Sequence, residues 1–310
     1  MIIENRPTNA SISTMWALKN YPDLNDFFKI SKHLGFQKIE LNHQIDSEML
    51  SNTNLDHYQF SSIHEPCPAN ISTKELADRD WLISSHDDDA RKHAVDIVKK
   101  SIDLANILGA STIVIHCGTI PCKVNYESKL RALFKAGDTQ ADGYQDIKAR
   151  FIQYRQGQVI PRLKAVIKSL NELIDYANQF HVKLGLENRY HYLDIPSLDE
   201  MGKLLSLADS SQLGFIYDVG HAQSLDRLGF YPHEEWLKQY SSMMIGAHIH
   251  DVIGVTDHYA PGLGEIDFKV IAKYLPEDAF RTFEMLPGNT LAQVKHGLNY
   301  MVETGCIKYL

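Results

Sequence analysis

Six apolar runs of the sequence, each typical of a buried strand, end in a histidine or a carboxylate of the kind that binds metal ions. In "LGFIYDVGHAQS" (213–224), the run ends in Asp218 and continues through Gly220 to His221. The residues at the six ends are His64, His116, Glu187, Asp218 with His221, His248 with Asp251, and Glu284. The later segment "GVTDHYAPGLGEID" adds Asp257 and His258. Such groups are costly to bury unless something binds them.

The elements that position these residues alternate along the chain. Eight short apolar runs predict strands, at 10–16, 37–41, 60–64, 111–116, 182–188, 213–218, 244–250 and 280–285. Helix-like segments separate them, most clearly at 89–108, which ends at the stop signal Gly109. Eight such units predict a parallel sheet closed into a (β/α)₈ TIM barrel. A doubly wound open sheet is the alternative, but both glycine-rich nucleotide-binding patterns are missing.

We expect one domain that spans residues 1–310. Its two longest connections, residues 65–88 and 118–145, both follow strand ends. Loops at that end of a barrel build the active face, so these two are candidate lids or substrate walls. Within the strand-end set, Gly220 is expected to permit a sharp turn that brings His221 over the rim. Asp251 is a candidate to orient a ligand histidine.

Composition limits the classes of protein to consider. The 310 residues are 44% apolar and 23% charged, which is typical of a folded globular chain. No window reaches the roughly 18 apolar residues of a membrane span, and "MIIENRPTNASIST" shows no secretory signal, so we expect a cytoplasmic protein. The net charge of −8 counts against a nucleic-acid partner, although a local basic rim would suffice for one. The four scattered cysteines are expected to be reduced thiols.

In a barrel the strand ends converge on one cavity, where several carboxylates would repel one another. A divalent cation removes this conflict. Carboxylate oxygen and imidazole nitrogen together suit Zn²⁺ or Mn²⁺ first, and also Co²⁺, Fe²⁺ or Mg²⁺. We therefore expect a site for one to three divalent metal ions at the barrel rim.

The ordered series "SIHEPCPANIS", "GASTIVIHCGT", "LGLENR", "IYDVGHA", "HIHD", "DHYAPGLGEIDF" and "FEM" resembles the xylose isomerase-like TIM-barrel superfamily, which includes sugar phosphate isomerases and epimerases and endonuclease IV. The resemblance covers about residues 10–303. It implies one metal ion held by Glu187, Asp218, His248 and Glu284. The endonuclease IV branch adds positions that match His64, His116, His221 and His258, which there complete a three-metal cluster. That branch has an aspartate two residues before the loop histidine. Here Thr256 holds that place and Asp257 is next to His258, which counts against a third ion.

Our first hypothesis is isomerisation or epimerisation of a sugar, a sugar phosphate or a related polyol-derived keto compound. The metal would bind vicinal carbonyl and hydroxyl oxygens and stabilise an enediolate, while Glu187 and Glu284 move the proton. His221, Arg189 and Asp257 are candidates to hold substrate oxygens, and a rim salt bridge is the alternative role for Arg189. Trp81 is a candidate to cap a sugar ring, with a packing role as its alternative.

Two other functions remain open from the sequence. An endonuclease IV-like phosphodiesterase that cleaves at abasic sites, or another hydrolase, would use the full histidine set to hold two or three ions. A non-catalytic barrel would keep the metal for stability only. The partner expected under the first hypothesis is a carbohydrate-like small molecule, and barrels of this kind often pair as homodimers.

Overall fold

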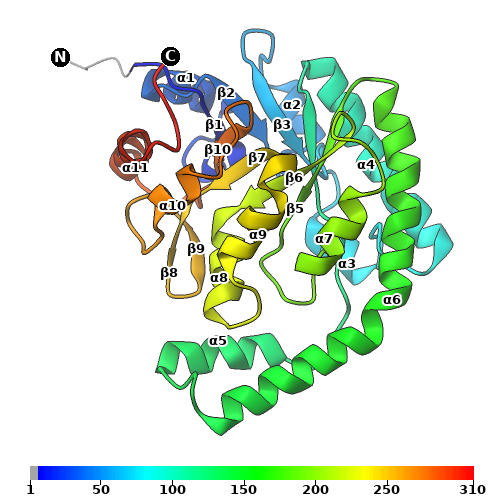
Figure 1. Cartoon of the computed structure of the whole chain (residues 1–310). Helices are drawn as coiled ribbons and strands as arrows, with labels where there is room; N and C mark the ends of the chain where they lie inside the picture. Colours follow the sequence, from blue (N-terminus) through cyan, green and yellow to red (C-terminus); the bar gives the residue numbers. More distant parts are fainter. Residues whose placement is uncertain (1–5) are drawn as a thin grey trace.

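The computed structural model describes residues 6–310, and residues 1–5, where the proposed domain and the segment read for a secretory signal begin, lie outside the described residues. Its centre is a closed barrel of parallel strands in the order β1-β10-β7-β6-β5-β4-β3-β2 (Figure 1). The strands are β1 (Ala10–Ser13), β2 (Lys38–Leu41), β3 (Phe60–His64), β4 (Thr112–Ile115), β5 (Lys183–Glu187), β6 (Leu213–Asp218), β7 (Met244–Ile249) and β10 (Phe280–Phe283). The predicted TIM barrel is confirmed, and each strand falls inside its predicted run.

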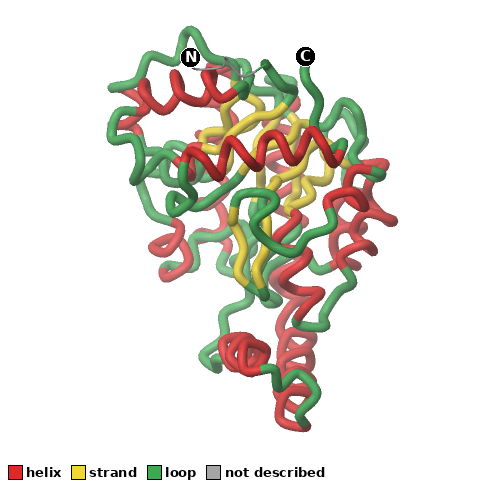
Figure 2. Tube along the Cα trace, turned by 90° about the vertical axis from the view of Figure 1, so that its left-hand side faces the viewer, coloured by secondary structure: helices red, strands yellow, loops and turns green. Residues whose placement is uncertain are grey.

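Helices cover the outside of the barrel (Figure 2). They are α1 (Leu24–Leu34), α2 (Ser47–Ser51), α3 (Thr73–Asp78), α4 (Asp88–Leu108), α5 (Tyr126–Ala136), α6 (Asp142–Asn178), α7 (Leu198–Leu205), α8 (Val219–Arg227), α9 (His233–Tyr240), α10 (Phe268–Ala272) and α11 (Leu291–Thr304), with short 3₁₀ turns at Thr14–Trp16 and Ser241–Met243. The helix predicted at 89–108 is α4. The Asp87 side chain caps its first turn, and Gly109 ends it with a positive φ of 68°.

The two long connections contain helices of their own. Residues 65–88 include α3, and residues 118–145 include α5 and the start of α6, a helix of 37 residues. In Figure 1, α5 and the first half of α6 extend below the barrel. A separate apolar cluster holds this arm on α8 and on the hairpin of β8 (Asp251–Ile253) and β9 (Thr256–Tyr259); its buried members are Leu130, Tyr144, Phe151, Tyr192, Leu225, Leu228 and Val255. The arm is thereby attached next to the face where the strands end.

None of the helices in residues 6–310 is both long enough and apolar enough to cross a membrane. The four cysteines are free thiols, of which three are buried and Cys122 is half-buried.

We expect Cys122 to be the one thiol that reacts readily with Ellman's reagent in the native protein at pH 8, because only thiolates attack the reagent and burial disfavours them. Burial raises the pKa of Cys67 to about 12 and that of Cys306 to about 11. Since both values lie above the unfolded value, the stability from these groups is complete below about pH 9 and is lost as the pH rises towards 11–12. Thiol counts, with Cys122→Ser as the control, test this. Rapid reaction of two or more native thiols would contradict it.

Candidate metal centre

The ends of four neighbouring strands bring Glu187, Asp218, His248 and Glu284 together. Each offers one ligand atom, and these atoms lie within 4.8 Å of one another in a buried cluster. The Nδ1 atom of His248 is 2.6 Å from Glu187 Oε1 and 3.3 Å from Glu284 Oε2. The parallel register places Asp218 opposite His248 on the adjacent strands β6 and β7. The sequence-predicted ligands therefore share one site at the carboxyl end of the barrel.

The groups of this cluster perturb one another's ionisation. Burial alone would raise the pKa of Glu187, but the Arg189 charge and hydrogen bonds from two histidines hold it well below its usual range. Burial also opposes a charged Asp218, yet the neighbouring histidines hold that pKa well below its usual value. Burial would lower the pKa of His248, but the surrounding carboxylates raise it well above its usual value. The cluster therefore concentrates negative charge around one imidazole.

Glu284 is the member of the cluster with a carboxyl oxygen that lacks a hydrogen-bond partner among residues 6–310. Burial raises its pKa to about 8, against the attraction of the charged His248. Its Oε1 atom is buried and has no hydrogen-bond partner in the described part of the chain. A divalent cation would supply both the missing partner and the missing positive charge. Three carboxylates and one imidazole are a donor set that such ions accept, so the residues fit a metal site.

Three further histidines present a nitrogen lone pair to the same rim. The Nδ1 atoms of His64, His221 and His258 each contact a backbone carbonyl, and since a carbonyl only accepts, each Nδ1 carries the proton. The carbonyls belong to Glu65, Asn188 and Glu284, at 3.2, 3.0 and 3.0 Å. The Nε2 atoms are therefore the free ligand atoms. Burial lowers the pKa of His258 to about 4 and that of His64 well below its usual value, which favours the neutral, metal-binding form.

These histidines belong to four further groups of potential ligands, among them two that overlap the central cluster only partly or not at all: His64 with His116 and Glu187, and His221 with Asp257 and His258. The Asp257 Oδ2 atom is 3.8 Å from His221 Nε2 and 3.7 Å from His258 Nε2. Asp257 still contributes a carboxylate to this group, although it lies next to His258 and not two residues before it. His258 has a positive φ of 61°, which breaks the strand alternation in which neighbouring side chains point to opposite faces. Adjacent residues then face the same space. A carboxylate is therefore present in this group in spite of the shifted aspartate, and the number of ions that bind stays a prediction.

Comparison with known proteins places this barrel in a family. The model of the family described as "Xylose isomerase-like TIM barrel" matches residues 28–303. The chain belongs to the xylose isomerase-like TIM barrel family. An uncharacterized protein of Sinorhizobium fredii is 27% identical over 205 residues, which are 64% of this chain and 53% of that protein, so the chain spans about half the length of this relative.

Solved structures share the barrel of this xylose isomerase-like protein. A D-tagatose 3-epimerase-like protein has a TM-score of 0.65 at 19% identity, with 95% of this chain and 96% of that chain covered. The IolI protein, solved with a bound zinc atom, has a TM-score of 0.65 at 17% identity, with 97% and 99% covered. At these identities the likeness shows the fold alone.

A buried glutamate that sequence reasoning missed orients the central histidine of this family member. Glu40, on β2, is fully buried, and its Oε2 atom is 3.1 Å from His248 Nε2. A carboxylate accepts hydrogen bonds, so Nε2 donates to Glu40. Nδ1 donates to Glu187 in the charged imidazole, and with Nε2 held by Glu40, Nδ1 is the nitrogen that could give up its proton to bind an ion. The sequence could have indicated this residue, because Glu40 is a carboxylate near the end of the predicted strand run 37–41. It was passed over because the run itself ends in Leu41.

His250, also missed as a site residue, supports Asp218. Its Nε2 atom donates to both Asp218 oxygens at 3.0 Å, while Nδ1 accepts the backbone N–H of His258 at 3.0 Å. A Cβ atom on Gly220 would lie 2.1 Å from the His250 ring. Gly220 is a residue of α8 and its φ is not positive, so it is required by this close approach and not by a sharp turn, contrary to expectation.

The remaining candidates have varied surroundings. Arg189 forms a close ion pair with Glu187 and lies 3.6 Å from Asp194. Trp81 lies outside the cluster, with its ring centroid 3.9 Å from that of His93. Asp251 accepts backbone N–H groups from Val252, Gly262 and Ile266, at 2.8, 2.9 and 3.2 Å. Its carboxylate thus anchors the following loop, and the expectation that it orients a ligand histidine is wrong.

Proposed function

We propose that this protein is a divalent-metal-dependent isomerase or epimerase of a sugar, a sugar phosphate or a related polyol-derived keto compound. The observation that carries the proposal is the buried cluster of Glu187, Asp218, His248 and Glu284, with the partnerless Glu284 oxygen. These four residues would hold the ion, with Zn²⁺ or Mn²⁺ as the first candidates. The D-tagatose 3-epimerase-like and zinc-bound neighbours support this choice of chemistry.

A cavity of about 280 Å³ lies over the cluster, lined by residues that include His43, His64, His116 and His221. Its size suits a small polar molecule. A bound divalent cation supplies Lewis-acid polarisation of a carbonyl oxygen. Neutral imidazoles, such as His116 with its pKa lowered to about 4 by burial, are suited to hydrogen-bond substrate hydroxyls.

In the proposed mechanism, two carboxylates at the ends of different strands would move the proton. Glu187 directs Oε1 to His248 and Oε2 towards His116, 3.0 Å away, next to Arg189. Glu284 directs Oε2 to His248, and its Oε1 has no partner. Glu284 Oε1 would therefore be free to accept or deliver a proton at the carbon between two substrate oxygens, and Glu187 Oε2 would do so after substrate displaces Arg189 from it. Asp218, held by two hydrogen bonds from His250, has no such freedom and serves to position the ion.

The test is proton exchange. The metal-loaded chain is incubated in D₂O with a panel of ketoses and ketose phosphates, and deuterium at the carbon next to the carbonyl is followed by NMR. We expect incorporation with at least one substrate, together with formation of its epimer or isomer. Metal-loaded protein that exchanges no proton on any panel member while it cleaves an abasic-site oligonucleotide would overturn the proposal. Bound metal with neither reaction would indicate the non-catalytic barrel.

A metal-dependent phosphodiesterase of the endonuclease IV type is the second candidate, favoured by the further groups of potential ligands beside the central cluster. The net charge of −8 counts against it, because a DNA backbone is bound chiefly by basic residues. The number of bound metal ions and the oligonucleotide cleavage assay together distinguish the two candidate functions.

Removal of the metal is expected to destabilise the fold, because the buried carboxylates of Glu187 and Asp218 would lose the charge of the ion and the buried Glu284 oxygen would be left without a partner. After dialysis against a chelator, the melting temperature should fall by on the order of 10 °C, and added zinc should restore it. Calorimetry with parallel metal analysis measures this. Unchanged melting after complete metal loss would refute a stabilising ion.

A further inference from the structure

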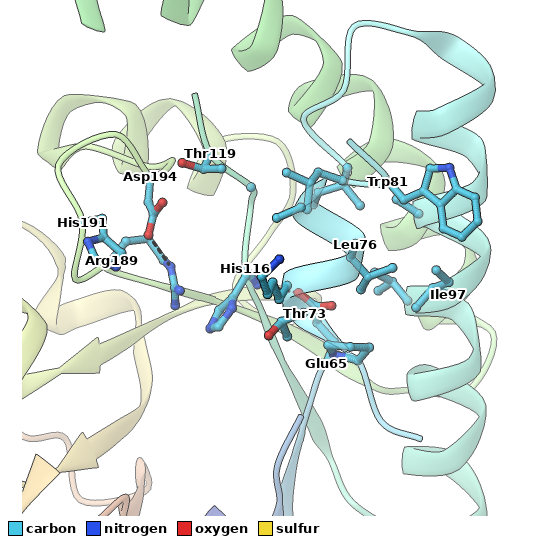
Figure 3. Close-up of a pocket in the computed structure, with 18 residues that line it drawn as sticks. Glu65, Thr73, Leu76, Trp81, Ile97, His116, Thr119, Arg189, His191 and Asp194 are labelled. Carbon is cyan, nitrogen blue, oxygen red and sulfur yellow. Dashed lines mark hydrogen bonds and ion pairs between the residues drawn. The ribbon is translucent and has the colours of Figure 1, made fainter. Parts of the chain in front are cut away.

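A second cavity, of about 400 Å³, opens beside the candidate metal centre and has a different character. Its walls come from the segment that carries α3 and from one face of α4. They are mainly apolar and include Leu76, Trp81, Leu82, Ile83, Ile97 and Val98. In Figure 3, Leu76 and Ile97 lie next to each other on one wall, and Trp81 lies on the same side. We call this space the side pocket.

The side pocket adjoins the cavity over the metal centre. Thr73, His116 and Arg189 line both spaces. Figure 3 shows His116 and Arg189 on the side of the pocket opposite Trp81. A molecule with one end at Glu187 and the other in the side pocket would pass between these shared residues.

Apart from Lys74 of α3, whose ammonium pairs with Asp78, the charged groups of the side pocket gather at this junction. Glu65 is 8% exposed, and its Oε1 atom accepts the backbone N–H of His116 at 2.9 Å. Asp194 lies 3.6 Å from Arg189. Beyond them, the wall formed by α3 and α4 offers mainly aliphatic and aromatic surface. A free sugar would bring hydroxyl groups against that wall without partners, which costs free energy.

We propose that the substrate is a carbohydrate derivative that carries an apolar substituent of one or two rings, and that the side pocket binds this substituent. This inference rests on the proposed function, since it assigns the polar end of the molecule to the metal centre. The volume is adequate, because a cavity of about 150 Å³ already holds benzene. Burial of the substituent against the apolar wall supplies binding energy away from the reacting carbon.

The experiment compares two probes on the zinc-loaded full chain, a 2-naphthyl glucoside and methyl glucoside, by isothermal titration calorimetry. We expect the naphthyl probe to bind at least tenfold more tightly. Ile97→Asp places a charge on the half-buried pocket face of α4 and should remove this preference. Ile107→Asp is the matched control, because Ile107 lies on the same helix, is 76% exposed and is not part of the pocket wall. Equal circular dichroism spectra and melting temperatures confirm that both variants fold.

Equal binding of the two probes to the wild-type chain would overturn the inference, as would an unchanged preference in Ile97→Asp. A ketose that exchanges its proton at the centre but does not compete with the naphthyl probe would also overturn it, because the two spaces would then be separate. These results leave the proposed function intact. Failure of the proposed function is distinguishable, since it is the absence of deuterium exchange on every substrate, whichever probe binds.

Discussion

Replacement of Glu187 by glutamine is expected to lower the rate of proton exchange by about 10²–10⁴-fold, the usual contribution of a positioned acid or base. Glutamine keeps the size of the side chain but offers no carboxylate to the ion or to the proton. The loss should appear in kcat at saturating substrate. Metal analysis of the same sample shows whether the ion is retained, which separates a lost base from a lost ligand.

Glu277→Gln is the control for this variant, because Glu277 lies on the surface with its side chain 86% exposed and pairs with Lys308. It should leave both activity and metal content unchanged. An exchange rate for Glu187→Gln within threefold of the wild type would refute the assigned role of Glu187. Glu284→Gln should give a loss of similar size, because the proposed mechanism needs both carboxylates.

Replacement of Glu200 by glutamine is expected to lower the free energy of unfolding by about 3–5 kcal/mol, the usual effect of removing one partner from a buried ion pair. Arg155 of α6 and Glu200 of α7 form two parallel contacts of 2.7 Å, and their side chains are 5% and 7% exposed. Arg155 also donates to the carbonyls of Tyr192 and Asp194. The variant would leave the guanidinium buried without a countercharge and loosen the segment that follows Arg189.

Urea unfolding measures this effect, with Glu75→Gln as the matched control. Glu75 pairs with Arg79 on the surface, where both side chains are about half exposed, so its loss should change stability by less than about 1 kcal/mol. Burial alone would raise the pKa of Glu200, but Arg155 holds it below its usual value. The pair therefore contributes stability at neutral pH that is lost as the pH falls through this lowered pKa. If the free energy of unfolding fell equally with decreasing pH in the wild type and in Glu200→Gln, the stabilising role assigned to the Arg155–Glu200 pair would be contradicted.

The strand-end residues could be located from the sequence because the signals are local. Apolar runs of five to seven residues with helical segments between them identify a barrel, and the histidines and carboxylates near the ends of these runs then fall on one rim. Glu187, Asp218 and His248 are the clearest cases, since each is at or next to the end of its strand. No contact between strands had to be known.

Glu40 and His250 also lie near the ends of their predicted runs, but their roles could not be predicted, for a physical reason. Glu40 meets His248 across the barrel, 208 positions away in the chain, and Ser62 donates to the same carboxylate oxygen. His250 meets Asp218 32 positions away, one residue beyond the end of its strand. Which of several polar residues turns inwards depends on these partners, and pattern alone does not contain them.

The sequence by itself determined the barrel, the face on which the chemistry lies and the kinds of ligand that gather there, because strand periodicity and residue type are local properties. The tertiary structure decided the rest. The positive φ of His258 brings Asp257 close to the His258 and His221 side chains. The His250 ring packs so close to Gly220 that no larger residue fits there. The side pocket exists only where α3 and α4 face each other beside His116. Backbone turns and packing between distant segments set these features, and no local pattern specifies them.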